Sequence, residues 1–508
     1  MRFTKSIKII FGIIVSAVVL SSCTKEAESL SIQEREKVSL EAWIKLNKPE
    51  LLGNYQENGG YYVEILEGDK NENIPISIDN NGRVINYGSA PLMEQDTCWV
   101  YTNMTGRDIN GSICLTRSGN LADMCGTFSY STHYVPFFNY CGNTNMGLLE
   151  GTYLAMRNEL KIGDATYKMR KGSKVRLYLP SSIAYGKGGS NTQGGYEGQY
   201  SLNASRPLVL DIEVLGAIKD PSKREEEMVS SYKGYSDETT PWVQAMKPES
   251  EKSDENDDLV LNGLYYNLKF NPETDNSAIY IKPHLDGTNN PYEDGKVYTS
   301  MANLNKQINE ILAKRFGKGL SAEAIEKGDK EVTMGGRANV WYIVRFLDGF
   351  VVDTNIAEIR TLVYKEDAPE CEAFSYSPVD DEGKAQSERQ AIGAWYYCIP
   401  KMHYGAYGQI LTTSGYAYGI SGLTGTTTTT ETSTSGSADY YNALNYYNYY
   451  NYYNSYYNYY SPYYNYYDYN YYNYNYVDSG ETVTTKTIST EILPYTPLVF
   501  TLFVEPNY

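Results

Sequence analysis

Alternation of apolar and polar residues with a period of two recurs along the chain and predicts β-strands. The stretch from Arg176 to Leu179 alternates in this way, as a half-buried strand does. Pro180 follows and can end the strand, because proline cannot donate to a β-ladder. A short hydrophobic turn then leads to Tyr185 and a glycine-rich loop, so the turn aims this tyrosine at a specific place.

A helical period appears within an insertion from about Thr274 to Val332. Apolar residues recur there at the spacing of one helix face, at Ile308, Ile311, Leu312 and Phe316. This spacing predicts a packed helix and indicates no binding site.

The first residues of the chain have the pattern of an export signal. Arg2, Lys5 and Lys8 precede an apolar run from Ile9 to Leu20, which is too short and too one-sided in its flanks for a stop-transfer helix. The run ends in Leu20-Ser21-Ser22-Cys23, which resembles the lipobox of bacterial lipoproteins. The resemblance implies that Cys23 is acylated and anchors the chain to a membrane, with residues 23–50 as lipid anchor and tether. The alternative is an ordinary signal peptide with a chance cysteine.

Composition narrows the class of protein further. The chain has 508 residues and a net charge of -18, which argues against nucleic acid or an acidic membrane face as a partner. An envelope compartment permits disulfides, and six cysteines besides Cys23 divide four and two between the halves of the chain. Pairing within each half fits this count, with the connectivity open. No CxxC pair exists and the histidines number 3, so we expect no metal and no cofactor. The six cysteines are Cys98, Cys114, Cys125, Cys141, Cys371 and Cys398.

Three pairs of segments recur in the same order and indicate an internal duplication. NGGYY from Asn58 answers to NGLYY from Asn262, and RDING from Arg107 answers to RFLDG from Arg345. PLVLDIEVL, residues 207–215, answers to PLVFTLFVE, residues 497–505. We therefore predict one domain over 51–220, a second over 259–508, and a charged linker with at most one solvated helix over 221–258.

The stretch from MRKGSKVRLYLPSSIAYGKGG to ASRPLVLDIEVL resembles the C-terminal half of an FKBP-type peptidyl-prolyl isomerase domain. The resemblance covers roughly Tyr61 to Ile218 and, more weakly, Tyr265 to Glu505. It implies an α+β fold in which a twisted antiparallel sheet wraps around one short helix, duplicated here with large insertions. Leu148 to Met156 would be that helix in the first half.

The resemblance also implies how such a domain works. The barrier to rotation about a peptide bond is about 18–20 kcal/mol, and unaided prolyl isomerisation takes roughly 10–100 s. In this family an aromatic bowl holds the proline ring, strips water from the imide and binds the twisted state best, without a nucleophile or a general acid.

Carried over by position, the first half keeps only part of this bowl. Met104 stands where the family has a tyrosine, and Cys114-Leu115 where it has an aromatic residue and an aspartate. Thr152 replaces the tryptophan of the floor and Leu210 a phenylalanine. A structural role for Tyr185 is as plausible as a catalytic one. The residues assigned to this altered substrate-binding pocket are Leu148, Leu149, Tyr185, Leu202 and Leu210.

The second half keeps more of the pattern. Tyr342 falls on the early-strand tyrosine, Val352-Asp353 on the pocket pair, and Phe500 on the aromatic residue of the last strand, while Phe374 is the candidate for the floor. The rim tyrosine is ambiguous between Tyr404, in IPKMHYG, and Tyr407, in AYG. Asp353 could also be only a turn residue. The candidate catalytic residues are Tyr342, Val352, Asp353, Phe374, Tyr404, Tyr407 and Phe500.

A long insertion, 408–492, takes the place of the family's short flap. It begins with Thr and Ser runs and is almost pure Tyr and Asn from Tyr440 to Tyr476. This composition lacks the aliphatic residues of a packed core and is typical of self-associating segments. Repeat expansion in a tolerant surface loop is the alternative.

Together these features predict an envelope lipoprotein, facing the periplasm or the cell surface from the outer membrane. Its expected activity is peptidyl-prolyl isomerisation, or a chaperone function derived from it, on proline-containing exported clients and chiefly in the second domain. The rival expectation is a catalytically degenerate binding or display protein that uses its Tyr/Asn arm for adhesion or assembly. A hydrolase is disfavoured, since no activated nucleophile with a base is visible.

Overall fold

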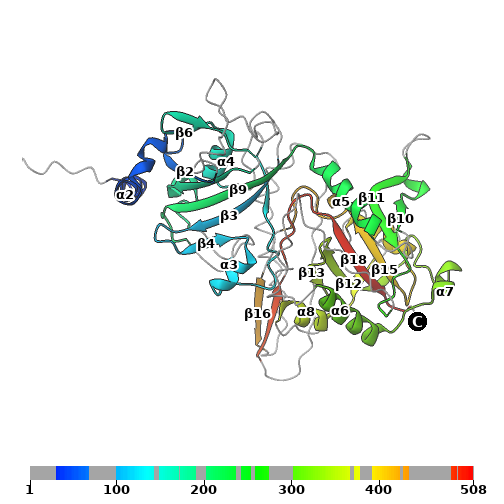
Figure 1. Cartoon of the computed structure of the whole chain (residues 1–508). Helices are drawn as coiled ribbons and strands as arrows, with labels where there is room; N and C mark the ends of the chain where they lie inside the picture. The colour runs from blue at the N-terminus through cyan, green and yellow to red at the C-terminus, as the bar shows by residue number, and fades with distance from the viewer. Residues whose placement is uncertain are drawn as a thin grey trace, which may run out of the picture.

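A computed structural model describes residues 30–67, 99–141, 148–170, 172–189, 202–235, 242–252, 258–273, 301–365, 371–377, 392–423, 427–433, 482–488 and 490–506. Two antiparallel sheets lie side by side, the first built from the blue to green part of the chain and the second from the green to red part (Figure 1). The predicted export signal, Cys23 and the Tyr440 to Tyr476 tract lie outside the described residues.

The first sheet has seven strands in the order β1-β2-β8-β9-β3-β4, with β5 paired to β3. Ala155 and Met156 of helix α4 pack into the same core as strand residues such as Leu177 and Ile212. A Cβ on Gly151 of α4 would come within 2.6 Å of the end of the Leu179 side chain, so the helix lies close against β8 at this glycine. The strands are β1 (Tyr55–Gln56), β2 (Tyr61–Glu67), β3 (Trp99–Arg107), β4 (Ile113–Thr116), β5 (Phe137–Tyr140), β8 (Lys174–Leu179) and β9 (Leu208–Ile218), with a separate ribbon β6 (Leu160–Ile162) and β7 (Ala165–Tyr167). The helices are η1 (Pro49–Asn54), α3 (Gly119–Met124), α4 (Glu150–Arg157) and η3 (Ser181–Ile183).

The second sheet repeats this plan in the order β10-β11-β15-β18-β12-β13, with β14 paired to β12. Helix α9 takes the place of α4, and the predicted amphipathic helix is α6, whose Ile308 and Leu312 are buried in the second core. The strands are β10 (Val243–Met246), β11 (Val260–Asn267), β12 (Ala338–Phe346), β13 (Val351–Thr354), β14 (Phe374–Tyr376), β15 (Tyr407–Thr412) and β18 (Leu498–Val504). The helices are η4 (Glu249–Glu251), α6 (Met301–Phe316), α7 (Ala322–Glu326), α8 (Ala357–Tyr364), α9 (Gly393–Cys398), η5 (Ile399–Lys401) and η6 (Ser414–Tyr416).

The predicted α+β fold is therefore confirmed, since each half is an antiparallel sheet with a short helix packed on it. In two of the three pairs of repeated segments, residues that match in sequence also occupy equivalent positions in the strand registers. Arg107 pairs with Val209 as Arg345 pairs with Val499. In the third pair, NGGYY and NGLYY, the structural match is shifted by one residue. Tyr62 pairs with Tyr178 of β8, and at the equivalent position of β15, Leu411, the partner is Tyr265 and not Tyr266.

The expected tether and linker both contain packed helices, which corrects the sequence interpretation of these segments. Helix α2 (Ile32–Asn47) begins with a capping box formed by Ser31 and Glu34, and its Leu40 and Ile44 pack on the outer face of the first sheet. Helix α5 (Pro221–Tyr235) does the same on the second sheet through Val229. The predicted linker, 221–258, also contains strand β10 of the second sheet, so both the tether and the linker hold elements that pack with the sheets.

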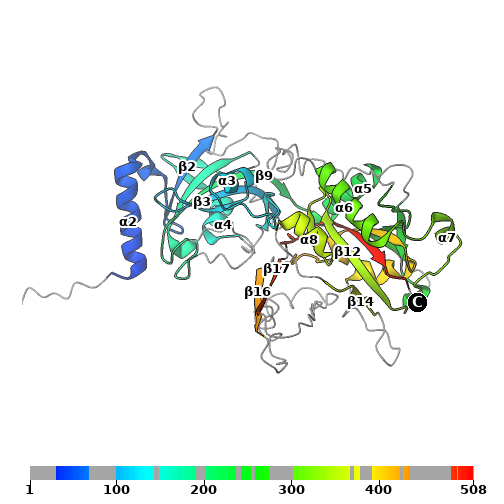
Figure 2. The same ribbon diagram turned by 90° about the horizontal axis from the view of Figure 1, so that it is seen from below.

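The large C-terminal insertion is also shorter than the sequence suggested. Its predicted start, Gly408, lies inside β15, which is an interior strand of the second sheet. After β15 and η6, the described part of the insertion includes a hairpin of β16 (Thr427–Ser433) and β17 (Thr482–Ile488), which projects where the two halves meet (Figures 1 and 2). Strand β15 was not predicted from the pattern of apolar and polar residues, because its sequence YGQILT is short and leads into the Thr- and Tyr-rich region.

Buried polar contacts join the two halves. The side chains of Arg117 and Glu491 form an ion pair at 2.6 Å, and both are less than a tenth exposed. His133 and Asp348 meet at 2.6 Å, with the imidazole stacked on Phe346. In the part of the chain that the structure describes, no helix combines the length and hydrophobicity that membrane crossing requires.

Cys398 lies at the end of α9 as a free thiol with no exposed surface, so the expected disulfide within the second half is not formed. Burial raises the pKa of this thiol and keeps it protonated at physiological pH. We therefore expect Cys398 to resist iodoacetamide at pH 8 in the native protein and to react once guanidinium unfolds the chain. Mass spectrometry of the alkylated peptide measures this, and rapid native labelling would contradict the packing described.

Candidate functional site

An aromatic cluster on the second sheet centres on Trp395 of α9. Its ring makes edge contacts with three others, at centroid distances of 5.4 Å to Tyr342, 5.0 Å to Phe374 and 5.9 Å to Phe500. The three partners come from β12, β14 and β18, so the helix packs its indole against rings from three strands of the sheet. The indole nitrogen of Trp395 is buried and has no hydrogen-bond partner among the described residues.

Trp395 was not among the predicted site residues, and Phe374 was the candidate for the floor position. Residue Ile392 precedes α9 with the same backbone conformation as Leu149 before α4, which makes Trp395 the counterpart of Thr152. Phe374 lies on β14 and contacts the indole from the side. The signal was present in IGAW, which has the spacing of LEGT in the first half.

The carboxylate of Asp353 lies at the edge of the bowl and is held from three sides. The Tyr342 hydroxyl donates to it at 2.9 Å and Arg360 of α8 at 3.0 Å, while the backbone N–H of Thr354 donates at 2.8 Å. Burial alone would lower the pKa of Arg360. The adjacent Asp353 carboxylate outweighs this effect and raises that pKa, so the guanidinium stays charged. Arg360 also donates to the Thr354 carbonyl at 2.6 Å, which fixes β13 to α8. Val352, beside Asp353, is buried in the same core.

The counterpart of the turn that carries Tyr185 is Ala417-Tyr418-Gly419, which the sequence analysis did not consider. Gly186 and Gly419 have φ values of 60° and 59°, in the left-handed region that favours glycine. Tyr185 packs against the first core and Tyr418 against the second.

The structure does not bring Tyr404 and Tyr407 to this turn. Tyr407 donates from its hydroxyl to the carbonyls of Leu312 and Gly317, and Tyr404 donates to the carbonyl of Arg337. Tyr407 begins β15, at the end of the strand opposite to the turn.

The chain returns to the sheet in the same way in both halves. Leu202 and Ile492 are buried and each stands five residues before the proline that opens the last strand. A Cβ on Gly189 would lie 2.3 Å from the Leu202 carbonyl oxygen, and one on Gly422 would lie 2.1 Å from that of Ile492. These close approaches require glycine and give Ile492 the place that was predicted for Leu202.

In the first half the same positions hold aliphatic side chains. The registers make Met104 the counterpart of Tyr342, because Met104 pairs with Ile212 where Tyr342 pairs with Leu502. In the same way Leu115, opposite Gly106, is the counterpart of Asp353, opposite Val344. Met104, Leu115 and Leu210 are buried together with Leu148, with Leu149 packed against them. The hydroxyl of Thr152 is buried there without a partner in the described part of the chain. At these positions the first half thus has aliphatic and hydroxyl side chains, with no aromatic ring in place of Trp395.

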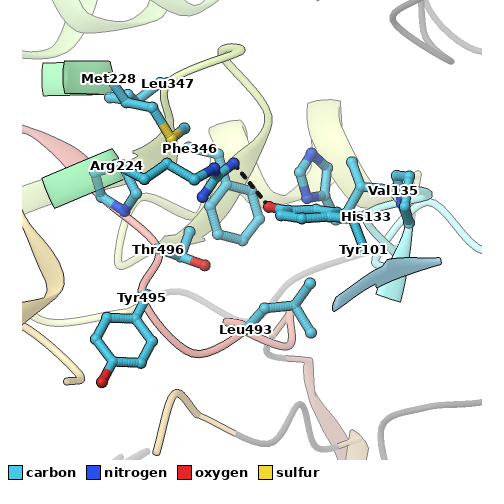
Figure 3. A pocket seen from close by; sticks show the side chains of 12 residues that line it. Tyr101, His133, Val135, Arg224, Met228, Phe346, Leu347, Leu493, Tyr495 and Thr496 are labelled. Carbon is cyan, nitrogen blue, oxygen red and sulfur yellow. Dashed lines mark hydrogen bonds between the residues drawn. The ribbon is translucent and has the colours of Figure 1, made fainter. Parts of the chain in front are cut away.

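A separate cleft lies between the halves and shares no lining residue with the Trp395 cluster (Figure 3). The Arg224 side chain crosses it to meet the Tyr101 hydroxyl at 2.9 Å, with its guanidinium 4.8 Å from the centre of that ring. His133, Phe346 and Tyr495 are among the other residues that line it. Its residues belong to the contact that holds the halves together.

Comparison with known proteins gives matches among solved structures only; no family model and no curated protein matches the chain. The three FKBP domains of wheat FKBP73 match with a TM-score of 0.19 and 10% identity, over 89% of this chain and 95% of that one. FkpA from Escherichia coli matches with a TM-score of 0.22 and 18% identity, over 42% and 72%. A peptidyl-prolyl cis-trans isomerase from Pseudomonas syringae gives 0.21 and 17%, over 37% and 98%. The description of the fold depends on the strand order, helix placement and shared register of the chain itself, and not on these matches.

Proposed function

We propose that the second half is a peptidyl-prolyl isomerase site. The observation that carries this proposal is the Trp395 cluster, in which rings from three strands surround an indole and a fixed carboxylate lies at the edge. An aromatic bowl of this kind takes up a proline ring and removes water from its imide bond. The rotation needs no proton transfer, so better binding of the twisted imide than of either planar form would accelerate it.

Within this proposal the residues have distinct tasks. Trp395, Phe374 and Phe500 supply the apolar surface, while Tyr342 and Arg360 hold the Asp353 carboxylate in place. Tyr418, on the turn equivalent to that of Tyr185, supplies the rim hydroxyl.

We propose the first half as a non-catalytic binding module, because aliphatic side chains fill its bowl. The proposed clients are proline-containing exported polypeptides. Acylation of Cys23 would hold the protein at a bacterial outer membrane, and the Tyr/Asn tract would gather clients or further copies of the chain.

Phe500→Leu tests the proposal, since it gives the second bowl the residue that the first half has at Leu210. We expect kcat/KM for a prolyl peptide to fall on the order of ten-fold, because the lost ring surface no longer shields the imide. A protease-coupled isomerisation assay on the full-length chain measures the change. The conservative first-half variant Ile212→Val is the control and is expected to stay within about two-fold.

A second variant removes the Tyr/Asn tract without touching the bowl. Ser433 pairs with Thr482 at the end of the β16–β17 hairpin, so replacing 434–481 by Asn-Gly closes it with a two-residue turn. We expect this variant to keep its isomerase activity. No acceleration by either the intact or the shortened chain would refute the isomerase and leave a binding scaffold.

A further inference from the structure

Each half has an N-terminal helix that brings one buried glutamate to the turn after an interior strand. Glu36 of α2 accepts hydrogen bonds from the backbone N–H and the hydroxyl of Ser181. Glu225 of α5 accepts the same pair from Ser414, at 2.8 and 2.7 Å. The two glutamates are 7% and 2% exposed, so both contacts are shielded from water.

The serine on which the glutamate acts is the base of the turn that carries the rim tyrosine. The Ser414 carbonyl accepts from the backbone N–H of Ala417 and of Gly419, both at 2.8 Å. These two residues flank Tyr418 on either side. In the first half the Ser181 carbonyl accepts from Ala184 and Gly186 in the same way. A continuous set of hydrogen bonds therefore runs from the helix to the backbone on both sides of the tyrosine.

The same turn rests on the helix that carries the floor of the bowl. A Cβ on Gly393 of α9 would lie 3.6 Å from Tyr416, which is in η6, and Gly393 stands two residues before Trp395. This contact couples the position of η6 to that of α9. Burial raises the pKa of Glu225, against the opposing effect of its hydrogen bonds to Ser414, so a carboxyl group is kept here at an energetic cost.

We propose that Glu225 is a positioning residue of the isomerase site, which holds the Ser414–Tyr416 turn so that Tyr418 stands at the rim of the Trp395 bowl. The inference rests on the proposed function of the second half. Glu36 holds the equivalent turn beside a bowl without aromatic rings, so its contact with Ser181 is structural only. The duplication therefore supplies a matched control within one chain.

Glu225→Ala in the full-length chain is expected to lower kcat/KM on the order of ten-fold, because a small displacement of a positioned group is costly for catalysis. Glu36→Ala is expected to stay within about two-fold, although both variants lose the same contacts. Glu225→Gln keeps an acceptor oxygen and should recover part of the loss. Equal losses in the Glu36 and Glu225 variants, or none in either, would overturn the proposal.

The Tyr418→Phe background separates positioning from general stability. If Glu225 acts through Tyr418, Glu225→Ala should reduce kcat/KM by less than about two-fold further in that background. An undiminished loss there would show that Glu225 acts by another route and would overturn the proposal.

Amide hydrogen exchange gives a readout that does not depend on activity. In Glu225→Ala the amides of Ser414, Ala417 and Gly419 should exchange at least about ten-fold faster, while those of β18 keep their protection. If the wild type proves inactive but the exchange behaves in this way, the proposed function fails and Glu225 still holds the turn. Unchanged exchange at these amides overturns the inference whatever the activity.

Discussion

Trp395→Leu is expected to lower kcat/KM for prolyl isomerisation on the order of 100-fold. The indole is the one side chain that contacts the rings of Tyr342, Phe374 and Phe500 at the same time among the described aromatic contacts. Leucine in its place removes roughly 100 Å² of apolar surface, which at about 25 cal/mol per Å² is about 2.5 kcal/mol. That loss corresponds to nearly two factors of ten in rate.

Stability has to be checked beside activity, because Trp395 is 2% exposed and its truncation weakens the core. Circular dichroism at the assay temperature shows whether the variant is folded. Thr152→Val, at the equivalent position of the first half, is the control and should leave kcat/KM unchanged. A folded Trp395→Leu protein with activity within about three-fold of wild type would mean that the bowl is not the site of catalysis.

Arg360→Met is expected to lower the free energy of unfolding of the second half by about 3 kcal/mol. The Arg360 side chain is 6% exposed and that of Asp353 26%, so the variant leaves a largely buried carboxylate without its cation. It also removes the bond from Arg360 to the Thr354 carbonyl. Activity should fall with stability, because Asp353 would then be held only by Tyr342 and a backbone N–H.

Urea unfolding of the single and double variants measures this coupling. Asp353→Asn combined with Arg360→Met should recover at least half of the lost stability, since the amide oxygen still accepts from Tyr342 and no unpaired charge remains. Lys327→Met breaks an exposed ion pair with Glu323 and should cost less than about 1 kcal/mol. Additive effects of the two substitutions would contradict the pairing of Arg360 with Asp353.

The sequence was sufficient for the fold because the strongest strands repeat. PLVLDIEVL and PLVFTLFVE form β9 and β18, and their pairing with β3 and β12 lets the strand positions of Tyr342 and Phe500 be found by counting along the chain. Positions that depend on strand register could therefore be carried from one half to the other.

The rest of the site depends on short elements whose sequence signals are weak. Helix α9 has six residues and lacks a side-chain cap, so its own sequence gives no helix-start signal, and only the match of IGAW to LEGT in the first half points to Trp395. Tyr418 was assigned to the insertion, because the Thr, Ser and Tyr content around it resembles that of the tract that follows. Glu225 lies in a segment so rich in charge that its composition indicates a solvated helix, and only the contact with Ser414 reveals its burial.

Because the hairpin of β16 and β17 holds both ends of the Tyr/Asn tract, the length of the tract can change in evolution without changing the sheet. The tract leaves and returns at Ser433 and Thr482, which are paired neighbours, so the sheet receives the same two chain ends whatever lies between them. Doubling the length of such a loop adds only about 0.6 kcal/mol to the cost of its closure. Gain or loss of Tyr-Asn codons can therefore proceed by replication slippage without any need for compensating substitutions in the bowl.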